Sequence, residues 1–283
     1  MKLIECPRDA MQGLHDYISV EDKVRYINAI LKVGFDTIDA GSFVSPKAIP
    51  QLKDTAEVLS KLNMDSTSSK LLVITANKRG AEKAVQFDEV SYLGFPFSIS
   101  ETFQQRNINS SIEDSLRRLE EVQNTCIKHN KKMVTYFSMA FGNPYGDEWS
   151  PEIVANWVEK LVTGGGVEIL SLSDTIGTSN PKTIKWLFDY VIPTFPDVEI
   201  GAHLHTTPDT WKEKVEAAIN SGCKRFDGAI KGFGGCPMAA DDLTGNMPTE
   251  NIISYLNENS IEHELNEEAF KEALLMSLEI FPN

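Results

Sequence analysis

Two histidines, His203 and His205, stand two residues apart at the end of an apolar stretch, and the chain has five histidines in all. Residues two apart on a β-strand point to the same side, so we expect both imidazoles to face one point. Neutral imidazole suits a divalent transition metal, and an added carboxylate makes the site acceptable to Mg²⁺ or Mn²⁺. The alternative is a hydrogen-bonded pair without a ligand, and the pattern favours the metal site.

Charged side chains follow two other apolar stretches. The run Cys6-Pro7-Arg8-Asp9 comes after the first of them, and Asp39 ends the second. If these stretches are parallel strands of one barrel, Arg8, Asp9 and Asp39 lie at the same end of it. A surface ion pair would also explain Arg8 and Asp9, so this signal gains its weight from the histidines.

Three further segments carry groups suited to such a site. Asp174, just after Ser171-Leu172-Ser173, either binds substrate or caps the following turn, and the sequence leaves both open. Cys236 lies in a glycine-dense loop at 231–237, where it is either an inert small residue or a proton donor near a metal. Asn246 offers an amide oxygen, although a plain Gly-Asn turn would be the simpler interpretation without the histidines.

The elements that must position these residues alternate along the whole chain. Strand-like stretches occur at 3–5, 37–39, 71–74, 89–93, 133–137, 167–171, 198–202 and 225–229. Eight strand–helix units within 283 residues favour a closed parallel barrel over an open sheet, and the first strand–helix turn lacks the dinucleotide-binding glycine fingerprint. The predicted fold class is α/β, a (β/α)₈ TIM barrel with its active site at the C-terminal strand ends.

Helical patterns separate the strand-like stretches. Ser19 stands three residues before Asp22, which predicts a capped helix start. Further helices are expected at 112–128, 151–162 and 208–220. We expect one catalytic domain over residues 1–283, with the barrel at about 1–245 and a short helical extension at about 250–283.

Composition narrows the class of protein. The formal net charge of −14 is spread along the chain, which argues against nucleic acid as a partner. The four cysteines form no CxxC pair and are expected to be reduced thiols. No apolar run of about eighteen residues is found, so no membrane association is expected, and the N-terminus has no apolar signal core. A cytoplasmic protein is the expectation.

Several motifs together resemble the 3-hydroxy-3-methylglutaryl-CoA lyase family of the DRE-TIM metallolyases, and the likeness covers nearly the whole chain. They are Pro7-Arg8-Asp9 with Gln12, Ser42-Phe43-Val44-Ser45-Pro46-Lys47, Asn107-Ile108-Asn109, Asp174-Thr175-Ile176-Gly177, His203-Leu204-His205, Gly234-Gly235-Cys236-Pro237 and Gly245-Asn246. The Ser-Phe-Val-Ser-Pro-Lys and Gly-Gly-Cys-Pro runs point to the lyases, whereas Arg-Asp and His-x-His indicate only the superfamily.

The resemblance implies a role for each of these residues. Implied metal ligands, for one Mg²⁺ or Mn²⁺ ion, are Asp9, His203, His205 and Asn246. Implied catalytic residues are Arg8, Asp39, His203 and Cys236, and implied substrate-binding residues are Gln12, Ser42, Lys47, Ser171 and Asp174. Arg8 would stabilise the negative charge that grows on the thioester oxygen.

The implied reaction is a retro-Claisen cleavage of an acyl-CoA, in the service of leucine catabolism. A base, His203 or a carboxylate such as Asp39, removes the proton of the tertiary hydroxyl, and the carbon–carbon bond breaks into acetoacetate and the enolate of acetyl-CoA. Cys236 would assist protonation. Asp39 replaces the family's more usual glutamate, and a homodimer is what the family suggests.

Four departures from the family pattern bear on substrate identity. After Gln12 the family has Asn-Glu-Lys, whereas this chain has Gly-Leu-His, so a lysine suited to a CoA phosphate is absent at His15. Thr206 replaces an aspartate after the histidine pair, which changes the support of the imidazoles. The stretch from Cys236 to Asn246 is one residue longer, and Ala-Met replaces Gly-Leu after the Arg-Asp pair.

Three other functions stay open from the sequence. One is a Claisen-type synthase that condenses acetyl-CoA with a 2-oxo acid, although such enzymes generally extend beyond the barrel. Another is a pyruvate-forming aldolase on a similar metal barrel, which the missing lysine keeps in play. The third is a sensor or scaffold that keeps the cation without turnover.

Overall fold

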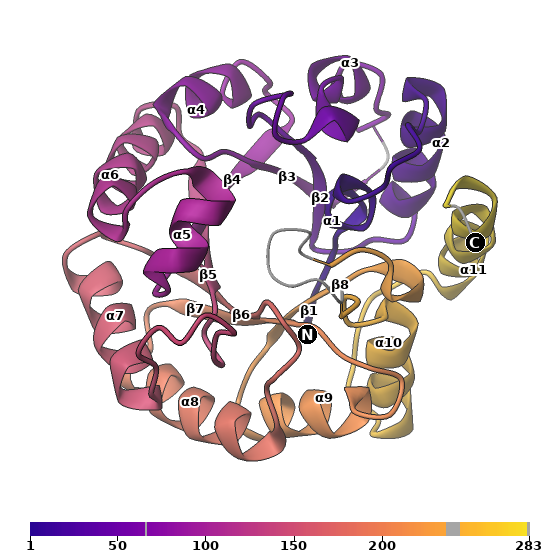
Figure 1. Cartoon of the computed structure of the whole chain (residues 1–283). Helices are drawn as coiled ribbons and strands as arrows, with labels where there is room; N and C mark the ends of the chain where they lie inside the picture. Colours follow the sequence, from indigo (N-terminus) through magenta and orange to yellow (C-terminus); the bar gives the residue numbers. More distant parts are fainter. Residues whose placement is uncertain (66, 236–243, 282–283) are drawn as a thin grey trace.

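The computed structural model describes residues 1–65, 67–235 and 244–281. Its strands are β1 (Lys2–Glu5), β2 (Thr37–Ser42), β3 (Lys70–Ile74), β4 (Val90–Ser98), β5 (Lys132–Ser138), β6 (Ile169–Asp174), β7 (Glu199–Leu204) and β8 (Arg225–Gly228). All neighbours pair in parallel, and β8 pairs with β1, so the sheet closes into an eight-stranded barrel (Figure 1). The expected (β/α)₈ fold is confirmed.

Helices surround the barrel and also cover its mouth. They are α1 (Pro7–Gln12), α2 (Val20–Leu31), α3 (Thr55–Leu59), α4 (Lys78–Ala84), α5 (Glu101–Ile108), α6 (Ile112–Lys128), α7 (Pro151–Thr163), α8 (Pro181–Thr194), α9 (Trp211–Asn220), α10 (Thr249–Glu258) and α11 (Glu267–Ile280), with short 3₁₀ turns η1 (Pro50–Leu52) and η2 (Ile230–Gly232). Most form an outer ring, whereas α1 and α5 lie over the barrel opening (Figure 1).

Local sequence explains where these helices begin. The Ser19 hydroxyl accepts a hydrogen bond from the backbone N–H of Asp22, as expected, and Ser111 caps α6 in the same way. One expected boundary is wrong: α9 begins at Trp211 rather than at Pro208. The Thr210 hydroxyl instead accepts from the Thr207 N–H, which holds this segment in a turn.

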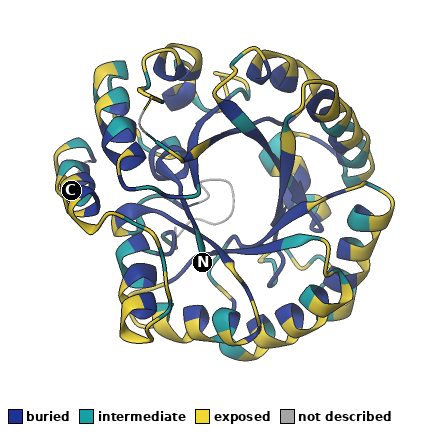
Figure 2. Cartoon of the chain, turned by 180° about the vertical axis from the view of Figure 1, so that it is seen from behind, coloured by how far each residue is buried: buried dark blue, intermediate teal, exposed yellow. Residues whose placement is uncertain are grey.

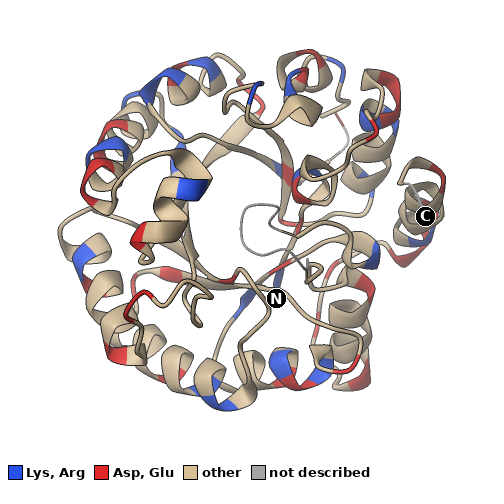
Figure 3. Ribbon diagram, viewed as in Figure 1, with Lys and Arg blue, Asp and Glu red and all other residues tan. Residues whose placement is uncertain are grey.

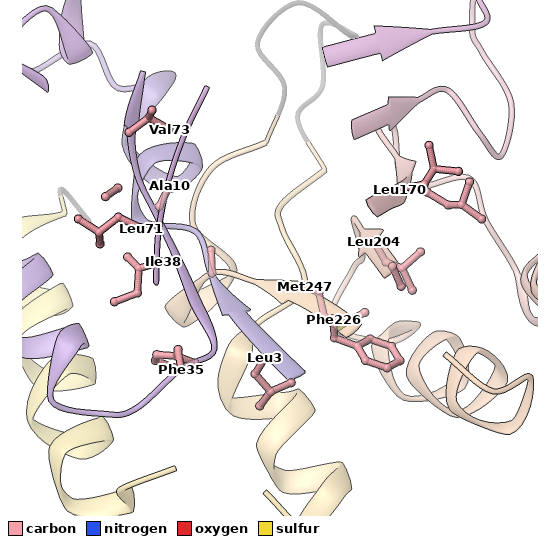
Figure 4. Close-up of a cluster of buried hydrophobic side chains, with 14 of the residues drawn as sticks. Leu3, Ala10, Phe35, Ile38, Leu71, Val73, Leu170, Leu204, Phe226 and Met247 are labelled. Carbon is pink, nitrogen blue, oxygen red and sulfur yellow. The ribbon is translucent and has the colours of Figure 1, made fainter. Parts of the chain in front are cut away.

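Alternation along each strand divides the core into two parts. One set, including Leu3, Ile38 and Leu71, packs between strands and helices (Figure 4). A second set, which includes Leu72 and Val134, forms a separate cluster on the opposite face of the sheet. Figure 2 shows the strands buried and the helices exposed on their outer faces, so the barrel is a packed scaffold beneath its mouth.

The C-terminal helices complete the ring. Helix α11 packs beside α2, where the Tyr26 and Phe281 rings meet edge-on with centroids 5.5 Å apart. Phe35 contacts Phe270 of α11 with centroids 6.3 Å apart. Throughout the described ranges, no helix is long and apolar enough to cross a membrane.

Candidate active site

The two histidines meet a carboxylate at the C-terminal end of the barrel. His203 lies on β7 and His205 just beyond it, with ring centroids 5.4 Å apart. Asp9 reaches them from α1, and one ligand atom from each of the three residues lies within 4.8 Å of the others. The spacing that the sequence predicted for the imidazoles is therefore present, with a carboxylate beside them.

Asn246 joins this group through Asp9. Its Nδ2 donates to Asp9 Oδ2 at 2.8 Å and to the Phe233 carbonyl at 2.9 Å, and its backbone bridges that of His205. With the amide nitrogen occupied in this way, Oδ1 is the atom that can bind a cation. Two imidazoles, a carboxylate and an amide oxygen form a donor set that fits a divalent cation.

The protonation of His205 agrees with this fit. Burial, with the neighbouring His203, lowers the pKa of His205 to about 4. Its buried Nδ1 has no hydrogen-bond partner among the described residues. A neutral imidazole is the form that binds a metal.

Arg8 is held by acidic groups on two sides. Its Nε and Nη2 donate to Asp39 Oδ2 at 2.9 and 2.5 Å, and its Nη1 donates to Asp9 Oδ1 at 2.6 Å and to Gln12 Oε1 at 2.9 Å. Burial raises the pKa of Asp39 to about 6, although Arg8 acts in the opposite direction. These contacts fix the guanidinium beside the histidine cluster.

Asp227 is a site residue that the sequence analysis missed. Its Oδ2 lies 3.2 Å from His203 Nδ1, and its side chain is fully buried. Burial alone would lower the pKa of His203, but Asp227 and Asp9 outweigh burial and raise it. The signal was present, because Asp227 is an acid inside the predicted last strand, and imidazole ligands usually donate to a carboxylate.

Arg8, Asp9 and the two histidines border a pocket of about 420 Å³ at the mouth. Its polar lining includes Arg8, Asp9, Gln12, Arg106, Asn107, Asn109, Arg118, Tyr136, Ser138, Ser173, Thr175, His203 and His205. Val44, Ala48, Ile49 and Ile74 form an apolar part. The sequence did not single out Tyr136, whose ring meets that of His203 edge-on with centroids 5.6 Å apart.

Comparisons with known proteins agree with this geometry. The family model described as HMGL-like matches residues 3–276. The chain belongs to the HMGL-like family. Hydroxymethylglutaryl-CoA lyase YngG of Bacillus subtilis is 34% identical over 90% of this chain and 84% of its own length. A Pseudomonas aeruginosa relative, named 3-hydroxy-3-isohexenylglutaryl-CoA/hydroxy-methylglutaryl-CoA lyase, is 33% identical over 91% of this chain and 85% of its own.

A solved structure of this family shares the whole architecture. The HMG-CoA lyase of Acinetobacter baumannii, in complex with coenzyme A and 3-methylmalate, matches with a TM-score of 0.90 and 28% identity. The match covers 98% of this chain and 90% of that one. The barrel fold is therefore shared with this solved lyase.

Some residues that the family resemblance assigned to substrate binding are not in the pocket lining. Ser171 is buried and donates to Asp227 Oδ2 at 3.2 Å. Ser42 is buried, and its hydroxyl accepts from the Val44 N–H. Lys47 is exposed beside the pocket. Gln12 is in the lining, where its Nε2 donates to Asp9 Oδ1 at 2.7 Å.

Asp174, for which the sequence left substrate binding and capping of the following turn both open, forms a buried ion pair. Lys214 Nζ donates to Asp174 Oδ2 at 2.9 Å, and the hydroxyl of Ser179 donates to the same oxygen at 2.5 Å. Lys214 also donates to the His205 carbonyl at 2.8 Å. Asp174 thus supports the backbone of His205 through Lys214, a contact that joins residues 40 positions apart.

The structure describes some of the residues at which this chain departs from the family pattern. Cys236 lies outside the described residues. Thr206 turns to Thr207 and Thr210, while Asp227 contacts the ring of His203. His15 is exposed.

Proposed function

We propose that this chain is a divalent-cation-dependent lyase that cleaves 3-hydroxy-3-methylglutaryl-CoA to acetyl-CoA and acetoacetate. One observation carries the proposal: Arg8, Asp9 and the two histidines meet in one pocket of an HMGL-like barrel. The names of the relatives and the coenzyme A bound to the Acinetobacter baumannii lyase support the substrate class. The proposal extends to leucine catabolism, a cytoplasmic location and a homodimer, as the sequence suggested.

Mg²⁺ or Mn²⁺ is the proposed cofactor. Asp9, His203, His205 and Asn246 would hold it. When bound, such an ion supplies a Lewis acid beside the reacting oxygens.

Arg8 is proposed to stabilise the negative charge that develops on the thioester oxygen. A guanidinium has five N–H groups, and the four hydrogen bonds of Arg8 leave one N–H on Nη2. Because Asp39 and Asp9 hold the group in place, this donor is oriented before substrate arrives. A donor that needs no reorganisation contributes most to charge stabilisation.

His203 is the better-placed candidate for the base. It is in the pocket lining, whereas Asp39 is fully buried behind Arg8. The base takes the proton of the tertiary hydroxyl, the carbonyl of acetoacetate forms, and the electron pair of the broken bond passes to the acetyl-CoA enolate. That carbon then takes up a proton. The role of Cys236 in this protonation stays a prediction. Asp227 occupies His203 Nδ1, so Nε2 carries the one available lone pair and takes the proton only while the imidazole is not bound to the cation.

A substrate with a longer acyl chain is the second candidate. The Pseudomonas aeruginosa relative is named for isohexenylglutaryl-CoA as well, and Val44, Ile49 and Ile74 give this pocket an apolar part that could receive a longer chain. 3-Hydroxy-3-methylglutaryl-CoA is the main proposal because more of the relatives are named for that substrate alone.

Acetoacetate release from 3-hydroxy-3-methylglutaryl-CoA tests the proposal. The purified protein is assayed with Mg²⁺, with Mn²⁺ and with chelator, beside a panel of longer 3-hydroxyacyl-CoAs. Release that chelator abolishes supports the proposal. Cleavage of a longer substrate alone moves it to the second candidate, and condensation of acetyl-CoA with a 2-oxo acid, or aldol cleavage, would replace it with the synthase or the aldolase.

A further inference from the structure

The pocket has the opposite charge balance to the chain. The chain carries a formal net charge of −14, whereas the described pocket lining contains three arginines and one aspartate. Arg8 and Asp9 neutralise each other in a direct ion pair. The excess positive charge therefore comes from the other two arginines, Arg106 and Arg118.

These two arginines stand on the wall formed by α5 and α6. Figure 3 shows acidic and basic residues interspersed round the outer helices, while α5, which reaches over the opening, carries an acidic segment in its first turn and a basic segment in its last turn. Arg106 is exposed on α5, and Arg118 is half-buried on α6. Within the described residues, neither forms an ion pair with a carboxylate.

Their geometry prepares them to bind a ligand. The Arg106 guanidinium lies 4.6 Å from the centroid of the Tyr145 ring, which restricts its motion. Arg118 Nη1 donates to the Ile108 carbonyl at 3.2 Å and so fixes the C-terminal end of α5. Asn107 and Asn109, which flank that end, are also in the pocket lining and add amide donors.

We propose that Arg106, together with Arg118, binds an anionic group of the acyl-CoA substrate, either the acyl carboxylate or a CoA phosphate. The inference rests on the proposed function and assigns one of its binding contacts. An anionic substrate is repelled by the chain's overall charge, so local cations must receive it. Arginine binds carboxylate and phosphate through paired N–H groups.

The absence of a lysine at His15 makes this wall more important. His15 is exposed, and its imidazole is not the ammonium that a lysine would offer to a CoA phosphate. A guanidinium is a planar cation with paired N–H donors that match a phosphate or a carboxylate. This chain therefore receives the anion on the side of α5 and α6.

Steady-state kinetics of Arg106→Gln test the inference on two substrates. One is 3-hydroxy-3-methylglutaryl-CoA, and the other is its N-acetylcysteamine thioester, which keeps the carboxylate and lacks every phosphate. We expect KM for the CoA substrate to rise about tenfold with kcat little changed. A rise on both substrates assigns the carboxylate, and a rise on the CoA substrate alone assigns a phosphate.

Two further variants serve as controls for the effect of Arg106→Gln on KM. Arg117→Gln is the matched control, because Arg117 is exposed on α6, pairs with Asp114 and is absent from the described pocket lining. Arg118→Lys keeps the charge and loses the planar fork, so a smaller rise in KM is expected. The inference is overturned if KM of Arg106→Gln stays within twofold of wild type on both substrates, or if Arg117→Gln raises KM equally.

Calorimetric titration of the wild type and Arg106→Gln with coenzyme A and with 3-hydroxy-3-methylglutarate separates the two proposals. If the wild type binds either compound but turns over neither substrate, the proposed function fails and the anion site stands. If turnover is normal and Arg106→Gln binds both compounds as tightly as wild type, the anion site fails alone.

Discussion

At the scale of single residues, Asp227 acts on the proposed metal site through the ring of His203. It contacts His203 Nδ1 and accepts from Ser171 at the same oxygen, without being in the pocket lining. We expect Asp227→Asn to weaken Mn²⁺ binding ten- to a hundredfold, because the ring of His203 loses its orientation. Calorimetry without substrate measures this. Ser171→Ala should weaken metal binding less and leave KM unchanged; a raised KM would return Ser171 to substrate binding.

Substitutions of Arg8 and of His205 should affect different properties of the enzyme, namely kcat for Arg8 and metal binding for His205. We expect Arg8→Gln to lower kcat by a hundredfold or more while metal stays bound, because the lost N–H stabilises charge that develops during the reaction. His205→Ala should lose the metal itself. Metal content after dialysis, measured beside kcat, distinguishes the two. Near-normal turnover in Arg8→Gln would remove its proposed role.

At the scale of elements, the loop after β8 must approach α1 closely. Gly234 has φ +89°, and a Cβ there would lie 2.5 Å from the Asp9 carbonyl oxygen and 2.9 Å from Asn246 Nδ2. Gly234→Ala should therefore displace two proposed ligands and weaken Mn²⁺ binding about tenfold or more. Gly146→Ala is the control, because Gly146 has φ +78° with nothing within 4 Å of a Cβ. Equal losses in both variants would attribute the effect to backbone strain alone.

At the scale of the whole molecule, Glu5 ties the first strand to the last elements. Its carboxylate accepts from the Ile230 N–H at 2.8 Å and from the Thr249 hydroxyl at 2.5 Å. Complete burial raises the pKa of Glu5 to about 8. The folded state therefore binds a proton that the unfolded state has already lost, in the window from the ordinary glutamate pKa of about 4.3 to about 8.

The consequence is a pH-dependent free energy of unfolding. Because the folded state binds more protons in that window, the contribution of Glu5 falls as pH rises, by up to about 1.4 kcal/mol per pH unit. Above about pH 8 the loss is complete. We expect Glu5→Gln to flatten the decline in Tm between pH 5.5 and 7.5. Glu120→Gln, on an exposed part of α6, is the control, and an unchanged slope in Glu5→Gln would contradict the assignment.

The sequence by itself determined the barrel and the groups at its mouth. Periods of two and of 3.6 residues are local properties, so the strands and most helices could be predicted, with α6 matching at both ends. The facing of His203 and His205 followed from alternation alone. Strand ends of a parallel barrel must gather at one face, which brought Asp9 to the histidines.

Only the tertiary structure decided which side chain meets which. Arg8 reaches Asp39, His203 reaches Asp227, and Asn246 reaches Asp9 across 31, 24 and 237 positions. Asp174 and Ser171 were expected at the substrate, yet their partners are Lys214 and Asp227. A buried polar group must find a partner, and that partner is set by barrel closure and strand register, which no local pattern in the sequence encodes.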